Sequence, residues 1–139
     1  MLDYSLFGRM MEMVHLDPYY GGVSTKDHTN SLYYAAANGK VLTHWSGNEL
    51  IGFCTYGLFT EKEVAEDRWS GSEVYSRRSG DVLYIPKFLC RAGRREVFRF
   101  VREIQRELSR RYPNAAIANC QRVYDHGSSR TGTWYRKAA

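Results

Sequence analysis

The stretch Asp81-Val-Leu-Tyr-Ile-Pro-Lys-Phe-Leu-Cys-Arg-Ala-Gly-Arg-Arg95 decides the fold, because it passes from a strand pattern into the start of a helix. Residues 81–89 carry the aliphatic and aromatic side chains that favour a buried strand. Pro86 interrupts this run and cannot donate a backbone hydrogen bond, so it predicts a bulge or bend. Residues 91–93 then predict a turn into a helix over residues 94–111, which ends before Pro113.

The helix predicted at 94–111 has two opposite faces. Its buried face holds five apolar residues at helical spacing: Val97, Phe100, Val101, Ile104 and Leu108. The opposite face holds a stripe of five arginines: Arg95, Arg99, Arg102, Arg106 and Arg110. Glu103 lies on the flank, where it is expected to pair with Arg99 and Arg106. The stripe has two interpretations: a solvated face of weak ion pairs, or a surface for nucleic acid or an acidic partner. No aromatic residue is expected among the arginines, which weakens the case for base stacking.

The segments upstream predict two helices followed by a hairpin. Apolar spacing indicates a helix over residues 6–15, and residues 24–27 resemble a capping box that opens a second helix ending at 38–39. Residues 41–45 and 49–59 predict two strands joined by a tight turn at 46–48. A further capping box at 60–63 predicts a short helix that ends near Trp69.

The remaining segments complete the predicted order. Residues 70–80 are polar and predict a loop or a weak edge strand, while 115–120 and 132–136 predict two short strands. The chain is therefore expected to be a single domain over residues 1–139. Its fold class is mixed α/β (α+β), with a mostly antiparallel central sheet flanked by helices.

Charge divides unevenly along the 139 residues. Residues 1–76 carry 5 Lys and Arg against 10 Asp and Glu, whereas residues 77–139 carry 15 against 5. A basic half of this kind suggests an anionic partner: a nucleotide-like cofactor, a nucleic acid, or the acidic surface of another protein subunit. The alternative is that the two halves neutralise each other within the fold.

Several classes of protein are not expected. The longest apolar run, residues 50–59, is shorter than the ~20 residues of a transmembrane helix, so no membrane association is predicted. The N-terminus lacks the pattern of a signal peptide. Three irregularly spaced cysteines and four scattered histidines form neither a disulfide framework nor a metal motif. The sequence therefore predicts a reduced, cytoplasmic protein without a metal.

The strand-to-helix turn is the best candidate for a binding site. A helix N-terminus presents unpaired amides and a partial positive charge, which suit a phosphate or pyrophosphate. Gly93 permits close approach, and Arg91, Arg94 and Arg95 add positive charge. A plain turn with surface arginines explains the same residues equally well.

The hairpin at 41–59, the strand at 81–89 and the turn and helix from 91 together resemble the GCN5-related N-acetyltransferase (GNAT) superfamily. This resemblance implies a bent strand that holds the pantetheine arm of an acyl-coenzyme A through backbone amides of residues 85–88, which include Ile85, Lys87 and Phe88. It also implies that the following turn holds the pyrophosphate. The superfamily turn usually has a second glycine, which is missing here.

Within the superfamily, three stretches resemble the RTX-toxin-activating lysine acyltransferases: residues 6–20, residues 41–63 and the basic tail around 122–123. Those enzymes move a fatty acyl group from acyl carrier protein to a lysine, using a His and an Asp. Their His position falls near Tyr19 and their Asp position near Leu83 or Tyr84, so neither residue is kept. Short acetyltransferase-like proteins of tailed phages are similar in size and in their loss of the motif.

Acyl transfer requires a proton acceptor for the amine and an acid for the leaving thiolate. The resemblance implies Tyr124 as the acid, although a packing tyrosine is the plainer interpretation. His126 is a candidate base because a histidine titrates near neutrality, and Glu49 and Glu73 are further candidates. Two functions follow as hypotheses: an acyl-CoA or acyl-carrier-dependent acyltransferase, or a degenerate GNAT-fold protein in a structure such as a phage virion.

Overall fold

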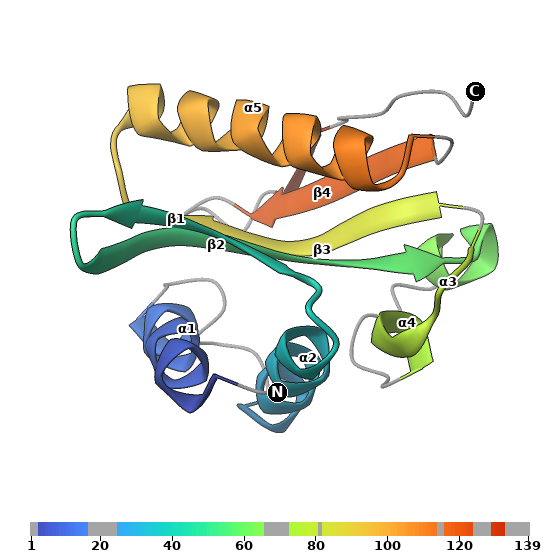
Figure 1. Cartoon of the computed structure of the whole chain (residues 1–139), viewed down its shortest axis with the longest axis horizontal. Coiled ribbons are helices and arrows are strands. Elements are labelled where there is room, and N and C mark those ends of the chain that lie inside the picture. The colour runs from blue at the N-terminus through green and yellow to red at the C-terminus, as the bar shows by residue number, and fades with distance from the viewer. Residues whose placement is uncertain are drawn as a thin grey trace.

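The computed structural model describes residues 3–16, 25–65, 73–80, 82–113, 116–123 and 129–132, which form helices on both faces of one sheet (Figure 1). The elements follow one another in the order α1 (Tyr4–Leu16), α2 (Thr25–Ala37), β1 (Val41–Ser46), β2 (Glu49–Phe59), α3 (Glu61–Ala65), α4 (Glu73–Ser76), β3 (Val82–Cys90), α5 (Arg94–Arg111), β4 (Ala116–Val123) and β5 (Ser129–Gly132).

The five strands of the described residues lie side by side in the order of the sequence, β1-β2-β3-β4-β5. Three neighbouring pairs are antiparallel, and only β3 and β4 are parallel. Helix α5 connects these two parallel strands and covers one face of the sheet, while α1, α2 and α4 cover the other face (Figure 1). The predicted mixed α/β class with a mostly antiparallel sheet is confirmed.

Glycines set the local boundaries of the hairpin, as the sequence predicts. Gly39 ends α2 with a φ of 68°, and Gly47 occupies the turn between β1 and β2 with a φ of 58°. Both values lie in the left-handed region, where glycine has no Cβ to clash. The predicted helix end and the predicted hairpin turn are therefore both confirmed.

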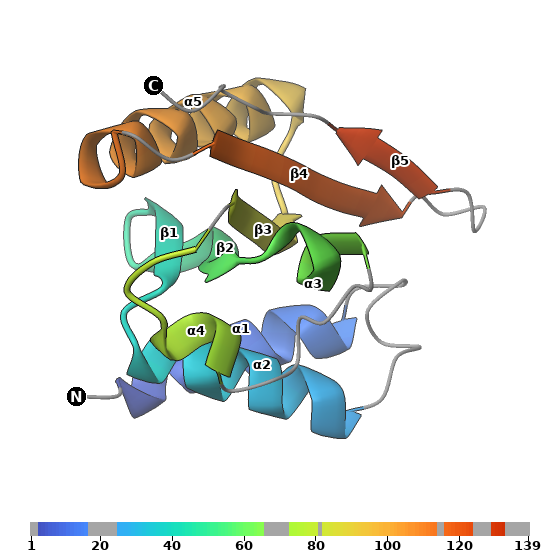
Figure 2. The same cartoon turned by 90° about the vertical axis from the view of Figure 1, so that its right-hand side faces the viewer.

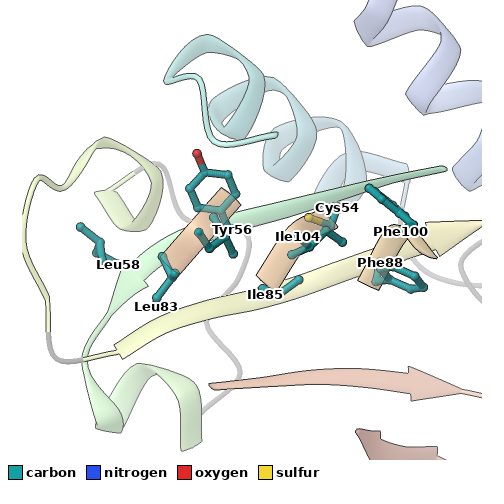
Figure 3. Close-up of a cluster of buried hydrophobic side chains, with 9 residues drawn as sticks. Cys54, Tyr56, Leu58, Leu83, Ile85, Phe88, Phe100 and Ile104 are labelled. Atoms are coloured by element: carbon teal, nitrogen blue, oxygen red, sulfur yellow. The ribbon is translucent and has the colours of Figure 1, made fainter. Parts of the chain in front are cut away.

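The core beneath α5 is formed by side chains from β2, β3 and α5 (Figure 3). Its buried members are Cys54, Tyr56, Leu58, Leu83, Ile85, Phe88, Phe100, Ile104 and Leu108. Gly52 makes room for the helix, because a Cβ at that position would lie 3.1 Å from the ring of Phe100. The apolar face predicted for α5 is thus the face that packs on the sheet.

The capping box at the start of α3 forms as predicted. The Thr60 amide donates to Oε1 of Glu63 at 2.9 Å, and the Glu63 amide donates to Oγ1 of Thr60 at 3.1 Å. The same carboxylate accepts a bond from Nη2 of Arg77 at 2.6 Å. Glu63 thereby ties the helix start to the segment that leads into β3, and the Arg77 guanidinium lowers its pKa to about 2.

The loop or edge strand predicted for residues 70–80 was wrong at Glu73–Ser76, which forms the single-turn helix α4, whereas residues 77–80 form a loop and 70–72 lie outside the described residues. Val74 and Tyr75 are both fully buried, and the Tyr75 hydroxyl bonds Oγ of Ser31 in α2 at 3.0 Å. Gly57 in β2 allows the close contact, since a Cβ there would lie 2.7 Å from the carbonyl oxygen of Val74. Tertiary packing, rather than local propensity, therefore decides this helix.

Other boundaries differ in smaller ways. Helix α3 is described to Ala65, and the predicted end near Trp69 lies outside the described residues. The final strand is Ser129–Gly132, so it meets the predicted strand at 132–136 only at Gly132, and residues 133–139 lie outside the description. In the described part of the chain, no helix has both the length and the apolar character needed to cross a bilayer.

Candidate functional site

The bulge predicted at Pro86 is present. Two residues of β3, Ile85 and Pro86, oppose the single β2 residue Tyr56, since pairing resumes on either side of them with a one-residue shift. Such a bulge bends its strand and increases the local twist. Proline fits at this position because it has no N–H to donate to a ladder.

The same point marks where β3 and β4 separate. Their parallel pairing runs from Val82 with Ala116 to Ile85 with Cys120. Beyond it, the described residues of β3 pair only with β2, and those of β4 pair with β5. Figure 2 shows the divergence, because β3 is seen end-on while β4 runs across the view. The carboxyl-terminal half of β3 therefore has one edge that no described strand covers.

The hydrogen bonds between β2 and β3 determine which backbone groups of β3 point away from β2. The Arg91 amide donates to the Ile51 carbonyl of β2 at 2.7 Å. Because successive residues of an antiparallel strand alternate in direction, the N–H and C=O groups of Phe88 and Cys90 point away from β2. Phe88 and Cys90 thus offer backbone donors and acceptors at the edge of β3 that β4 no longer covers.

The strand then enters the bend before α5. Gly93 is the N-cap residue of α5, with φ −63° and ψ 167°, and no side chain caps the helix. A Cβ added at Gly93 would meet no atom within 4 Å, so the space above the first turn is open. Arg91, Arg94 and Arg95 are exposed and form no ion pair with any described residue. The N-terminus of α5 with its flanking arginines, here called the helix mouth, therefore combines unpaired backbone amides, partial positive charge and three guanidinium groups.

Of the predicted binding residues of β3, only Phe88 points its backbone groups outward, because Lys87 pairs with β2 and Ile85 pairs with β4. Ile85 and Phe88 are buried under α5, and the Phe88 ring stacks on Phe100 at a centroid distance of 5.5 Å. Lys87 is also fully buried and lies opposite Thr55 of β2, whose Oγ1 has no hydrogen-bond partner among the described residues. The three side chains are part of the core and leave the strand edge open.

The predicted catalytic residues are not brought together by the described structure. Glu49 is exposed at the start of β2, opposite Ser46 in the hairpin. Glu73 is exposed at the start of α4, which lies at the other end of the sheet (Figure 1). Tyr124 and His126 lie outside the described residues. Of the two described candidates, Glu49 lies at the end of the sheet where the arginine-rich bend begins.

Two carboxylates of α5 hold a buried histidine that the sequence did not single out. Nε2 of His44 lies 2.9 Å from Oε2 of Glu96, and Nδ1 lies 3.2 Å from Oε2 of Glu103. The imidazole also stacks on Phe100, with ring centroids 5.1 Å apart. The bond from His44 lowers the pKa of the Glu96 carboxyl, and nearby Arg99 adds to the effect. The pairs predicted from Glu103 to Arg99 and Arg106 were therefore wrong, because Glu103 turns toward the sheet.

The arginine stripe also differs from its prediction. Phe98 lies among the arginines of α5 with 61% of its surface exposed. An open hollow of about 620 Å³ is lined by Phe98 together with Arg95, Arg99, Arg102, Glu103 and Arg106. An aromatic ring is thus interleaved with the stripe, contrary to the sequence analysis. The i, i+3 and i+4 spacing of residues 95, 98 and 102 could have revealed it.

No protein-family model matches the chain, and no curated protein matches it significantly.

No group of three or more His, Cys, Asp or Glu side chains is placed to hold a metal ion within the described ranges. The two features that present chemistry there are the β3 edge with its helix mouth, and the outer face of α5. The first is made of backbone groups and was predicted from Pro86 and Gly93. The second depends on which way the glutamates of α5 turn, which helical spacing alone does not determine.

Proposed function

We propose that this chain is a small GNAT-fold acyltransferase that binds an acyl-CoA or acyl-carrier thioester and transfers the acyl group to an amine. One observation carries the proposal. The uncovered edge of β3 begins at the Pro86 bulge and leads directly into the uncapped, arginine-flanked N-terminus of α5. A pantetheine arm ending in a pyrophosphate has this same order of groups: amides first, then two phosphates.

In this proposal the arm binds as an added strand. Its amides pair with the outward N–H and C=O groups of Phe88 and Cys90, in the way that extended ligands add to an open sheet edge. The pyrophosphate lies at the first turn of α5, where Gly93 leaves space and Arg94 and Arg95 supply charge. An acyl carrier protein would present its phosphate in the same place, with Arg91 available for its acidic surface.

The chemistry follows from the thioester. The amine nitrogen attacks the carbonyl carbon, a base accepts the amine proton, the carbon–sulfur bond breaks, and the thiolate leaves with a proton from an acid. We assign the acid to Tyr124 and the base to His126 or Glu49. Glu49 is supported by its exposed position at the arginine-rich end of the sheet.

The second candidate is a GNAT-fold protein that has lost catalysis and acts as a structural subunit, for example in a phage virion. It is favoured by the positions where the lysine acyltransferases carry their Asp. Leu83 and Tyr84 occupy them, and both are buried in the core with 0% and 2% of their surface exposed. A carboxylate could not be restored there without a large cost in stability.

Calorimetry with acetyl-CoA and octanoyl-CoA tests the first candidate. Gly93→Asp is the decisive variant, because it caps α5 and stabilises the helix by a few tenths of a kcal/mol or more, yet places a negative charge where the pyrophosphate is expected. Gly93→Ser is the matched control, since it caps the helix without charge. We expect binding to weaken at least tenfold in Gly93→Asp and much less in Gly93→Ser.

The two candidates give different outcomes. If neither thioester binds the wild-type protein at millimolar concentration, or if both glycine variants bind alike, the acyltransferase proposal is wrong. A folded protein that binds no thioester and assembles into oligomers would support the structural candidate instead.

A further inference from the structure

The outer face of α5 adjoins the proposed thioester site at Arg95 and extends beyond it along the helix, where it has its own chemistry. Phe98 exposes 61% of its surface in the middle of the helix, inside the hollow of about 620 Å³. Arg95 precedes it by three residues and Arg102 follows it by four, so both flank the ring on the same face. Arg106 extends this face by another turn, giving a length of about 16 Å from Arg95 at ~1.5 Å per residue.

The carboxylates of α5 leave this face with a net positive charge. Glu96 and Glu103 bond His44 of β1, and Glu107 pairs with Arg110 and Arg111. Glu103 also lines the hollow, where its one negative charge stands against four arginines. Among the cations of the face, Arg99 pairs with Glu96 at 3.1 Å. Arg95, Arg102 and Arg106 form no ion pair with the described residues, and they therefore keep their charge available for a ligand.

We propose that this face binds single-stranded nucleic acid, with Phe98 stacking on a base and Arg95, Arg102 and Arg106 contacting phosphates. Each nucleotide of a single strand supplies both a phosphate and an unpaired flat base, which matches a ring set among cations. A duplex would leave Phe98 without a base to stack on, because its bases are already stacked. An acidic protein surface would neutralise the arginines but provides no regular flat partner for the ring.

Fluorescence anisotropy with labelled 12-nucleotide oligo(dT) and oligo(rU) tests the proposal at several salt concentrations. Neutralising three phosphates on a single strand predicts a slope of about −2 for log affinity against log salt. A 12-base-pair duplex and a poly-glutamate peptide serve as competitors. We expect both competitors to displace the oligonucleotide only at much higher concentration.

Two variants separate stacking from charge. Phe98→Ala removes an exposed ring and should weaken binding about 5- to 100-fold without unfolding the protein. Arg102→Glu should weaken binding and reduce the salt slope by at least one phosphate contact, about 0.7. The matched control is Arg78→Glu, which makes the same charge change on an exposed residue outside α5. It should leave the affinity within about twofold.

The outcomes also separate this proposal from the thioester proposal. Gly93→Asp should weaken CoA binding at least tenfold while Phe98→Ala should not affect it, and Arg95 is not used to separate the two sites because it belongs to both. The nucleic-acid proposal is overturned if no oligonucleotide binds at 50 mM salt. It is likewise overturned if Phe98→Ala binds as wild type, or if duplex or poly-glutamate competes as well as the single strand.

Discussion

Nε2 of His44 lies 2.9 Å from Oε2 of Glu96, and this bond joins the edge strand β1 to the first turn of α5. The ring is almost fully buried and is stacked on Phe100, whereas Glu96 is one-third exposed. The histidine thus fixes two things together: the position of the helix on the sheet, and the direction of the carboxylates relative to the arginines.

Replacing His44 should weaken the packing of α5 on the sheet and release the carboxylate of Glu96. In His44→Leu, loss of the aromatic stack costs about 1 kcal/mol of unfolding free energy, measured by urea denaturation. The pKa of Glu96 should rise toward its ordinary value, because the bond from His44 is the main cause that lowers it. Carboxyl NMR titration measures this, with Arg99→Gln as a control that removes a smaller cause. An unchanged Glu96 pKa in His44→Leu would contradict the assignment.

Glu63 predicts a loss of stability in acid. Arg77 and the capping bonds lower its folded pKa from 4.5 to about 2, so the carboxylate stabilises the fold above pH 4.5. That contribution is lost as the pH falls through about 2. Glu63→Gln should therefore be less stable than wild type by about 3 kcal/mol at pH 7, with the gap narrowing below pH 4.5. Urea denaturation at pH 7, 4.5 and 3 measures it, and a gap independent of pH would refute the prediction.

Two glycines should respond differently to the same substitution. Gly57→Ala places a Cβ 2.7 Å from the Val74 carbonyl oxygen and should cost about 1–3 kcal/mol by displacing α4. Gly93→Ala places a Cβ in open space and should change stability by less than about 1 kcal/mol. Thermal denaturation of the two variants provides the comparison. Equal effects would mean that α4 does not pack against β2 as described.

Tyr56 should ionise well above the ordinary range of a tyrosine. Burial raises its pKa to about 12, although Arg111 donates to its hydroxyl oxygen at 2.6 Å and acts in the opposite direction. A raised folded pKa means that Tyr56 stabilises the fold below pH 10 and that this contribution is lost as the pH rises through 12. Ultraviolet titration should show a late-ionising phenol that is missing from Tyr56→Phe. A titration in which the variant and wild type coincide would contradict this burial.

The sequence predicts those parts of the fold that depend on local patterns. Alternating apolar residues and glycines with positive φ locate the hairpin. Five apolar positions at helical spacing locate α5 and its buried face, and Pro86 locates the bulge. Helix α4 could not be predicted, because it forms around the contact of Tyr75 with Ser31, 44 residues away.

The candidate sites divide in the same way. The helix mouth follows from Gly93 and its neighbouring arginines, which are adjacent in the chain. The character of the outer face of α5 depends on His44, which lies 52 residues before Glu96 and bonds the carboxylates of Glu96 and Glu103. A helical projection treats every side chain as pointing straight outward, so it predicts pairs for Glu103 that the tertiary structure replaces.

The bulge at Pro86 also limits how another molecule can pair with this edge of β3. An unpaired strand edge is a template for intermolecular pairing and aggregation. Here the uncovered edge of β3 starts at a residue that has no N–H, and only Phe88 and Cys90 extend their polar groups outward beyond it. Two residues with free backbone groups can pair with an extended ligand, but they offer too few hydrogen bonds for a neighbouring molecule to begin a fibril.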